Sequence, residues 1–234
     1  MMARYAGSPY HQQFNSPIGN LCHYKFIFPD DDKFLGATSF NKIHQPGNGP
    51  GDDTAIQREQ TSYWLVRQLG LPWNYRRFVA VYVNGHRRGT LMEDAQTPDA
   101  DVVKEQFPND ADGFLYKLQP WFEFNATGQN FNNNSWCTLN DYTTADGSKK
   151  LARYRWNYLA RRTPDSANNY TNVFALIDAA NTPDPNAYVT NMESLVDMEE
   201  WMRIFAVEHA VGNWDAFGSQ NEQNMYAYKP RNGR

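Results

Sequence analysis

Hydrophobic and polar residues alternate along five short runs of the chain, and a two-residue period of this kind predicts β-strands. The runs lie at residues 20–28, 77–83, 89–93, 113–118 and 224–229. Asn84-Gly85 follows the second run, and an Asn-Gly pair in that position is typical of a tight hairpin turn. We therefore expect the second, third and fourth runs to form one small antiparallel sheet with a helix beside it.

Apolar residues recur at helical spacing in three other segments. The first begins at Asp53-Thr54, has Gln57 placed as in a capping box, and is closed by Gly70 and Pro72. Four apolar residues lie near one face of this helix: Ile56, Tyr63, Trp64 and Leu69. We expect the helix to pack against a neighbouring element through this face.

The other two helical segments lie in the last third of the chain. Residues 168–180 carry an apolar face and end at a proline-containing stretch, 181–185. The clearest helix begins at Asp197, with Glu200 three residues later, and ends at Gly212. By contrast, residues 119–164 are rich in Asn, Gly, Trp and Thr without a sustained period, and we expect a long irregular insertion there.

Composition places the chain among folded globular proteins. Its 234 residues are 41% hydrophobic, enough for one large or two small domains, so disorder is excluded. A net charge of −4 argues against a basic nucleic-acid-binding chain, and no nucleic-acid partner is expected. No run approaches the roughly 18 apolar residues that span a bilayer. Cys22 and Cys137 have no metal-ligand spacing and leave the redox compartment open.

Asp215 is the first candidate for chemistry. It lies just past a predicted helix end and before a predicted strand, with Asn221 and Asn224 within ten residues. Phosphoryl-transfer enzymes use such a loop, in which an aspartate accepts the proton of the attacking hydroxyl and an asparagine holds a divalent metal. The alternative is that Asp215 is an Asx-turn residue and the asparagines are ordinary surface groups.

Lys117 is the second candidate, because a lysine inside an apolar strand must reach water or meet an anion. In a nucleotide-binding lobe that anion is a phosphate, and Glu93 is placed to orient the lysine. The alternative is a solvated lysine on the outer face. The hairpin segment 84–89 is the third candidate, since Arg88 and the flanking glycines suit phosphates, although a plain surface turn fits as well.

Taken in order and spacing, these segments resemble the CotH kinase family, named for a bacterial spore-coat protein. The resemblance runs from about Lys25 to Lys229. The best-matching pieces are Arg58–Pro72, Val79–Gly85 with Gly89 and Glu93, Asp112–Lys117, Val196–Arg203, Gly212–Asp215 and Asn224–Tyr226.

The resemblance implies an α+β, atypical protein-kinase-like two-lobe fold. Its parts would be a sheet-containing N-lobe at about 20–118, the insertion at 119–164 and a helical C-lobe with the catalytic loop at 165–234. The family's activity is transfer of the ATP γ-phosphoryl group to protein serine or threonine with a divalent metal. The implied cofactors are therefore ATP and Mg²⁺ or Mn²⁺, and the implied partner is a protein substrate. Many members are secreted, so an extracellular, cell-surface or spore-coat location is favoured.

Family roles carry over only to matching positions. Asp215 looks like the catalytic aspartate, Asn224 like the metal-binding asparagine and Lys117 like the nucleotide-phosphate lysine. Glu93 matches the glutamate that follows the hairpin.

The sequence also departs from the family pattern. A further acidic metal ligand is expected after the last strand, but the sequence ends at Arg234. We therefore expect a truncated domain that binds metal and ATP poorly. Asn224 follows Asp215 by nine positions, where ordinary kinases have five, so Asn221 is a rival ligand.

Two other functions remain open at this point. One is an inactive surface or coat-protein module that binds partners or carbohydrate on the same fold, using the aromatic, Asn-rich segment 121–156. The other is a glycosidase with Glu93 and Asp94 as its acidic pair, which has no support beyond the two carboxylates.

Overall fold

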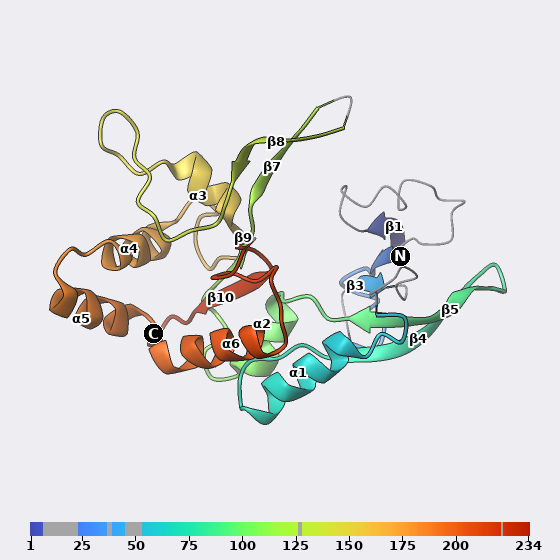
Figure 1. Cartoon of the computed structure of the whole chain (residues 1–234). Helices are drawn as coiled ribbons and strands as arrows, with labels where there is room; N and C mark the ends of the chain where they lie inside the picture. Colours follow the sequence, from blue (N-terminus) through green and yellow to red (C-terminus); the bar gives the residue numbers. More distant parts are fainter. Residues whose placement is uncertain (7–22, 37–38, 45–52, 126–127, 221) are drawn as a thin grey trace. The chain divides into compact units, whose positions relative to one another are not determined.

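The computed structural model describes most of the chain (Figure 1). The described residues are 1–6, 23–36, 39–44, 53–125, 128–220 and 222–234. The chain combines helices with antiparallel sheets, so the predicted α+β class is confirmed. It divides into two compact units, Met1–Val102 and Val103–Arg234, and each is described by itself. Within the described residues, no helix is long and apolar enough to cross a membrane.

The first unit contains a five-stranded antiparallel sheet in the order β1-β2-β3-β5-β4. Its strands are β1 (Met2–Ala6), β2 (His23–Ile27), β3 (Ser39–His44), β4 (Arg76–Val83) and β5 (His86–Ala95). Helix α1 (Arg58–Gln68) lies beside β4. The predicted strand at 20–28 is thus confirmed as β2.

The predicted hairpin joins β4 to β5. Asn84 and Gly85 have φ angles of 52° and 79°, the positive values that a two-residue turn of type I′ requires. The expected connection between the two strands, residues 84–88, is too long, because this turn needs two residues and β5 begins at His86. Arg87 already pairs with Tyr82 across the hairpin.

Helix α1 begins later than its capping pattern predicts. The Asp53 carboxylate accepts a hydrogen bond from the backbone N–H of Arg58 at 2.6 Å, so it caps the helix from five residues away. Gly70, with φ of 69°, closes the helix as expected. The predicted packing face is confirmed only in part: Ile56, before the helix, is buried and Tyr63 is half-buried, but no residue of α1 is buried and Trp64 and Leu69 are 58% and 48% exposed.

The second unit contains a three-stranded antiparallel sheet, β10-β6-β9, and a separate hairpin, β7-β8. Its strands are β6 (Phe114–Leu118), β7 (Trp121–Asn125), β8 (Gly128–Ser135), β9 (Tyr158–Arg162) and β10 (Met225–Lys229). Its helices are α3 (Leu151–Asn157), α4 (Thr171–Ala180), α5 (Pro185–Leu195) and α6 (Met198–Ala210), and α2 (Ala100–Gln106) spans the division between the units. The predicted helices at 168–180 and after Asp197, and the predicted last strand, are confirmed.

Strand β6 does not join the β4-β5 sheet, which corrects the expected three-strand grouping. All its residues except Lys117 are buried, so the strand needs cover along both edges and on its core face. β10 and β9 supply the two edges.

Two further differences concern segments expected to be irregular. Residues 119–164 hold β7, β8, α3 and β9, whose short lengths hide their periods in a segment rich in Asn and Gly. The stretch after α4 is only four residues long, because Pro185 starts α5 and Asp184 caps it by accepting from the backbone N–H of Ala187 at 2.8 Å. The Asp-Pro pair was a helix-start signal.

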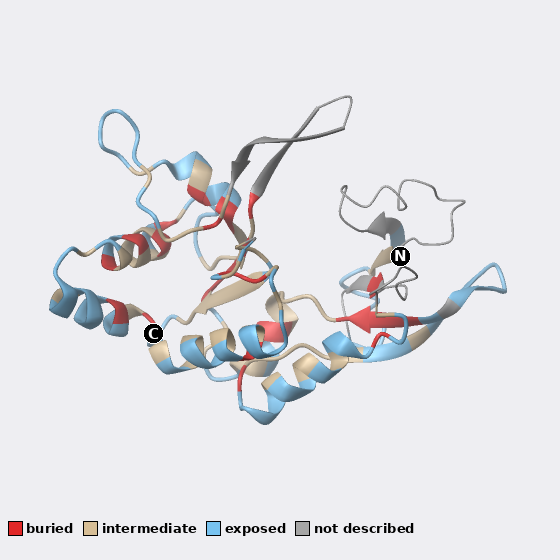
Figure 2. Ribbon diagram, in the orientation of Figure 1, coloured by how far each residue is buried: buried red, intermediate tan, exposed pale blue. Residues whose placement is uncertain are grey.

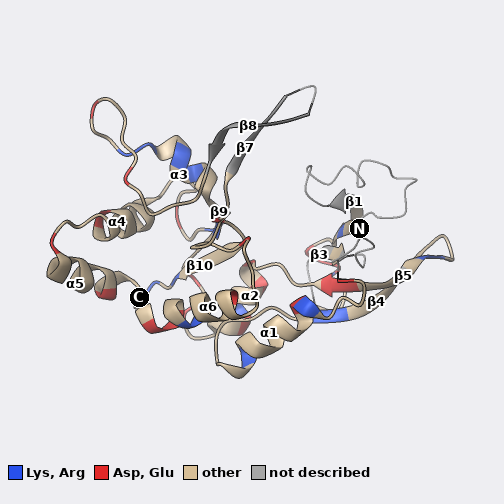
Figure 3. Ribbon diagram, viewed as in Figure 1, with Lys and Arg blue, Asp and Glu red and all other residues tan. Residues whose placement is uncertain are grey.

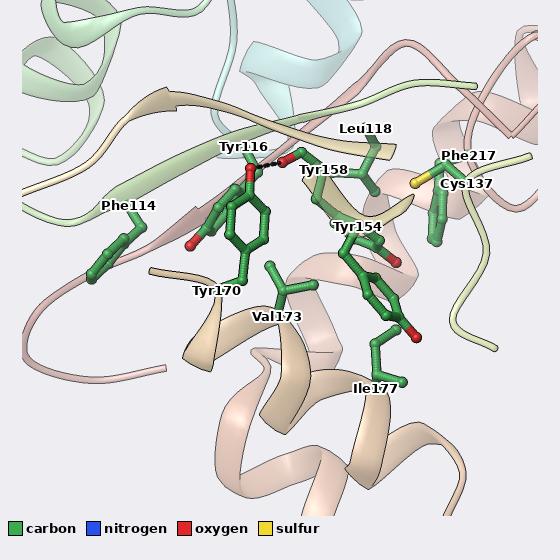
Figure 4. Close-up of a cluster of buried hydrophobic side chains, with 10 residues drawn as sticks. All are labelled: Phe114, Tyr116, Leu118, Cys137, Tyr154, Tyr158, Tyr170, Val173, Ile177 and Phe217. Carbon is green, nitrogen blue, oxygen red and sulfur yellow. Dashed lines mark hydrogen bonds between the residues drawn. The ribbon is translucent and has the colours of Figure 1, made fainter. Parts of the chain in front are cut away.

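Buried side chains of the second unit gather between the β6 sheet and the helices (Figures 2 and 4). Tyr170 donates its hydroxyl to the backbone carbonyl of Tyr158 at 3.0 Å, so the core satisfies this buried phenol. The cluster comprises Phe114, Tyr116, Leu118, Cys137, Tyr154, Tyr158, Tyr170, Val173, Ile177 and Phe217. It provides the rigid support for the loop that follows α6.

Candidate functional site

The end of α6 places Asp215. Gly212, with φ of 70°, stops the helix, and the backbone N–H of Asn213 donates to the carbonyl of Glu208 at 2.9 Å. The Asn213 side chain then accepts from the backbone N–H of Asp215 at 3.2 Å. This Asx turn is centred on Asn213, so it does not use the Asp215 carboxylate.

The Glu208 side chain holds this turn to the helix. Its carboxylate accepts a hydrogen bond from the Asn213 side-chain amide at 2.6 Å. Burial raises the pKa of Glu208, while the bond from Asn213 and the nearby His209 oppose the rise. Helix, turn and Asp215 are thus connected by side-chain hydrogen bonds.

Phe217 anchors the loop that begins at Asp215. It is buried, and its ring centroid lies 6.4 Å from those of Trp201 and Phe205 on α6. Gly218 follows with φ of 82°, a conformation that favours glycine. The chain then folds back, and Gln223 forms a parallel bridge with Ala216.

This return brings Asn224 to Asp215 although nine positions separate them. The Nδ2 of Asn224 donates to Oδ2 of Asp215 at 2.6 Å, and the Nε2 of Gln223 donates to Oδ1. The structure therefore brings two of the predicted site residues together. Asn221, the rival ligand, lies outside the described residues. The sequence did not single out Gln223, although its position beside Asn224 was a signal.

Lys117 lies on the central strand of the same unit. It pairs with Tyr226 of β10, two positions after Asn224, and with Leu159 of β9. Burial lowers the pKa of Lys117, and Arg161 lowers it further. Within the described part of the chain, Lys117 makes no salt bridge. A half-buried cation near a second cation favours an anion as its partner.

Sequence reasoning missed Arg161. It lies on β9 two positions after Leu159, the partner of Lys117, at a register shift of the β6–β9 pair, and its charge contributes to the lowered pKa of Lys117. The Arg161-Arg162 pair at the end of a strand was the available signal.

Glu93 belongs to the first unit and is 1% exposed (Figure 3 shows the charges). Its carboxylate accepts from Arg76 Nη1 at 2.9 Å, and Arg76 also pairs with Glu59 of α1. Burial raises the pKa of Glu93, and Arg76 opposes the rise. Its partner within the unit is thus Arg76, and the pairing with Lys117 stays a prediction.

Asp94 and Arg88 complete the predicted residues. Asp94 is 1% exposed and accepts from Arg77 Nε at 2.7 Å. It neighbours Glu93 on β5, so the two carboxylates leave the strand on opposite sides, and this does not favour a paired glycosidase site. Arg88 is exposed on β5 opposite Val81, and its phosphate contact stays a prediction.

The oxygen atoms of Asp215 and Asn224 supply only part of a binding site for a cation such as Mg²⁺. In the described ranges, no three His, Cys, Asp or Glu residues cluster as a metal site. Asp215 and Asn224 nevertheless offer a carboxylate and an amide oxygen. Mg²⁺ is commonly held by one or two carboxylates, waters and substrate phosphates, so these residues fit a metal that arrives with a nucleotide.

Comparison with known families gives one match. The family model described as CotH kinase protein matches residues 25–234. No curated protein matches the chain.

Proposed function

The chain belongs to the CotH kinase family, and from this premise we propose that it transfers the γ-phosphoryl group of ATP to serine or threonine hydroxyls of a protein substrate. The substrate oxygen forms a bond to the γ-phosphorus as the bond to ADP breaks. Catalysis of this kind depends on positioning and charge more than on covalent chemistry.

The observation that carries the proposal is the hydrogen bond between Asn224 and Asp215. It joins the two residue types that phosphoryl transfer needs in one loop, despite their unusual spacing. Asp215 is half-buried and accepts the proton of the attacking hydroxyl. Asn224 turns its amide N–H₂ to Asp215, which leaves its oxygen for a metal.

Lys117 holds the phosphates in this proposal, with Arg161 beside it on the neighbouring strand. A phosphate would offset the cost of burying the Lys117 charge and raise its lowered pKa. The roles of Glu93 and Arg88 toward the lysine and the nucleotide stay predictions from the family pattern. Asn224 would hold Mg²⁺ or Mn²⁺ together with the phosphates, and the metal would supply neutralisation of the developing charge.

The test is transfer of ³²P from Mg-ATP to the chain itself and to a mixture of Ser- and Thr-containing proteins. Asp215→Asn should lower kcat at least about 100-fold, because removing an activating group in the transition state costs that much. The matched control Asp30→Asn, at an exposed turn, should leave kcat unchanged. Equal transfer by the wild type and Asp215→Asn would contradict the proposal.

A further inference from the structure

Two adjacent side-chain amides hold the two oxygens of one carboxylate. Gln223 Nε2 donates to Oδ1 of Asp215, and Asn224 Nδ2 donates to Oδ2. From this geometry we infer that Gln223 is a positioning residue for Asp215. The inference rests on the proposed function, because the orientation of Asp215 matters to a reaction only if Asp215 takes part in it.

The backbone around Gln223 is shaped for this contact. Glu222 and Asn224 have φ angles of 46° and 59°, a left-handed conformation that is uncommon for residues other than glycine. Such conformations persist where the surroundings impose them, and they cluster at functional sites. Here the bridge from Gln223 to Ala216 and the buried Phe217 impose the path.

The contact leaves the carboxylate able to act. Each oxygen of an ionised carboxylate accepts more than one hydrogen bond, so a substrate hydroxyl can donate to Asp215 while both amides stay bound. The torsion that rotates a carboxylate is soft, because its wells are broad. Two donors from one backbone segment fix the carboxylate plane, and loss of Gln223 removes one of the two.

The two amides then have separate tasks. Asn224 would hold the metal through its oxygen, so its loss would weaken nucleotide binding. The Gln223 side chain donates to the carboxylate, so its loss should reduce kcat and leave the KM for ATP unchanged. Loss of folded protein alone would lower the apparent kcat with KM unchanged, so recovery of kcat in Gln223→His is the readout that separates positioning from folding.

The experiment compares Gln223→Met, which keeps the shape and loses the donor, with Gln223→His, whose ring N–H can donate to the same oxygen. We expect Gln223→Met to lower kcat by about 10- to 100-fold, the range for a lost hydrogen bond to a charged group. Its KM for ATP should stay within about twofold, and Gln223→His should recover most of kcat. The matched control is Gln220→Met, at an exposed position of the same loop, which should match the wild type.

A second readout does not depend on activity. The Nε2 protons of Gln223, assigned by their absence in Gln223→Met, should exchange with water more slowly than those of Gln220. This protection should disappear in Asp215→Ala. An active wild type with full kcat in Gln223→Met would overturn the inference and leave the proposed function standing. Absence of transfer by the wild type would overturn the proposed function, and equal exchange at Gln223 and Gln220 would overturn the contact itself.

Discussion

Two groups of charged residues, one in each unit, are held in different ways. In the first, Glu93 and Asp94 are each 1% exposed and each paired with an arginine of β4, Arg76 or Arg77. In the second, Lys117 is half-buried without a salt bridge in the described ranges, and Asp215 is held by neutral amides. Glu93 and Asp94 thus have cations as partners, whereas among the described residues no salt bridge holds Lys117, and a charge of that kind can meet an anionic ligand.

The largest expected effect is a loss of stability when the partner of Glu93 is removed. Arg76→Met should lower the free energy of unfolding by about 3–5 kcal/mol, because it leaves the buried Glu93 carboxylate without its cation. Urea denaturation measures the loss. The control Arg87→Met, at an exposed position of β5, should change it by less than about 0.5 kcal/mol. A loss below about 1 kcal/mol for Arg76→Met would show that the pair does not stabilise the sheet.

The loop anchor should give the next largest loss. Phe217→Ala should cost about 3 kcal/mol or slightly more in unfolding free energy, because it opens a cavity beside Trp201 and Phe205. Phe217→Leu, which keeps most of the volume, should lose less than half as much. Equal losses for the two variants would mean that the ring does not fill the space between α6 and the loop.

A smaller effect is expected on Mg-ATP binding when Arg161, near Lys117, is replaced. Arg161→Met should weaken Mg-ATP binding about three- to tenfold, since one exposed cation near the phosphates contributes modestly, and should leave stability almost unchanged. Isothermal titration measures the affinity. Arg155→Met, at an exposed position of α3, is the control. Unchanged affinity in Arg161→Met would remove Arg161 from the phosphate site.

The smallest effect is a pH dependence in the first unit. Glu93 has a raised pKa in the folded state, so the folded chain holds its proton more tightly than the unfolded chain does. Its contribution to stability is therefore fully present below the unfolded pKa, and is lost as the pH rises through the folded pKa. Glu93→Gln should flatten the fall in stability over that window in urea titrations. An unchanged slope would show that Glu93 does not titrate there.

Much of the local structure followed from short patterns. The Asn84-Gly85 turn and the cap at Asp197 depend on neighbours in sequence, and both were predicted. The sheet membership of β6 was not, because an apolar strand does not reveal which edges cover it. The polar composition of 119–164 likewise hid β9, whose pairing with β6 is non-local.

The sequence predicted which residues belong to the candidate site, but it did not predict which of them contact one another. Asp215, Asn224 and Lys117 could be selected because their chemistry fits phosphoryl transfer. Asp215 and Asn224 are nine positions apart, and the loop between them brings them together through the burial of Phe217 and the bridge from Ala216 to Gln223. The spacing of the two residues in the sequence does not predict these contacts. Gln223 and Arg161 were missed for the same reason, since each acts through a neighbour that only the fold supplies.

The most direct test of the central contrast is Mg-ATP binding by Lys117→Met, measured by isothermal titration beside the exposed control Lys104→Met. Removing a half-buried, unpaired cation should not lower the melting temperature, yet it should weaken Mg-ATP binding at least about tenfold. Lys104→Met should bind as the wild type does. Wild-type affinity in Lys117→Met would contradict the account, because the unpaired charge would then have no ligand to meet.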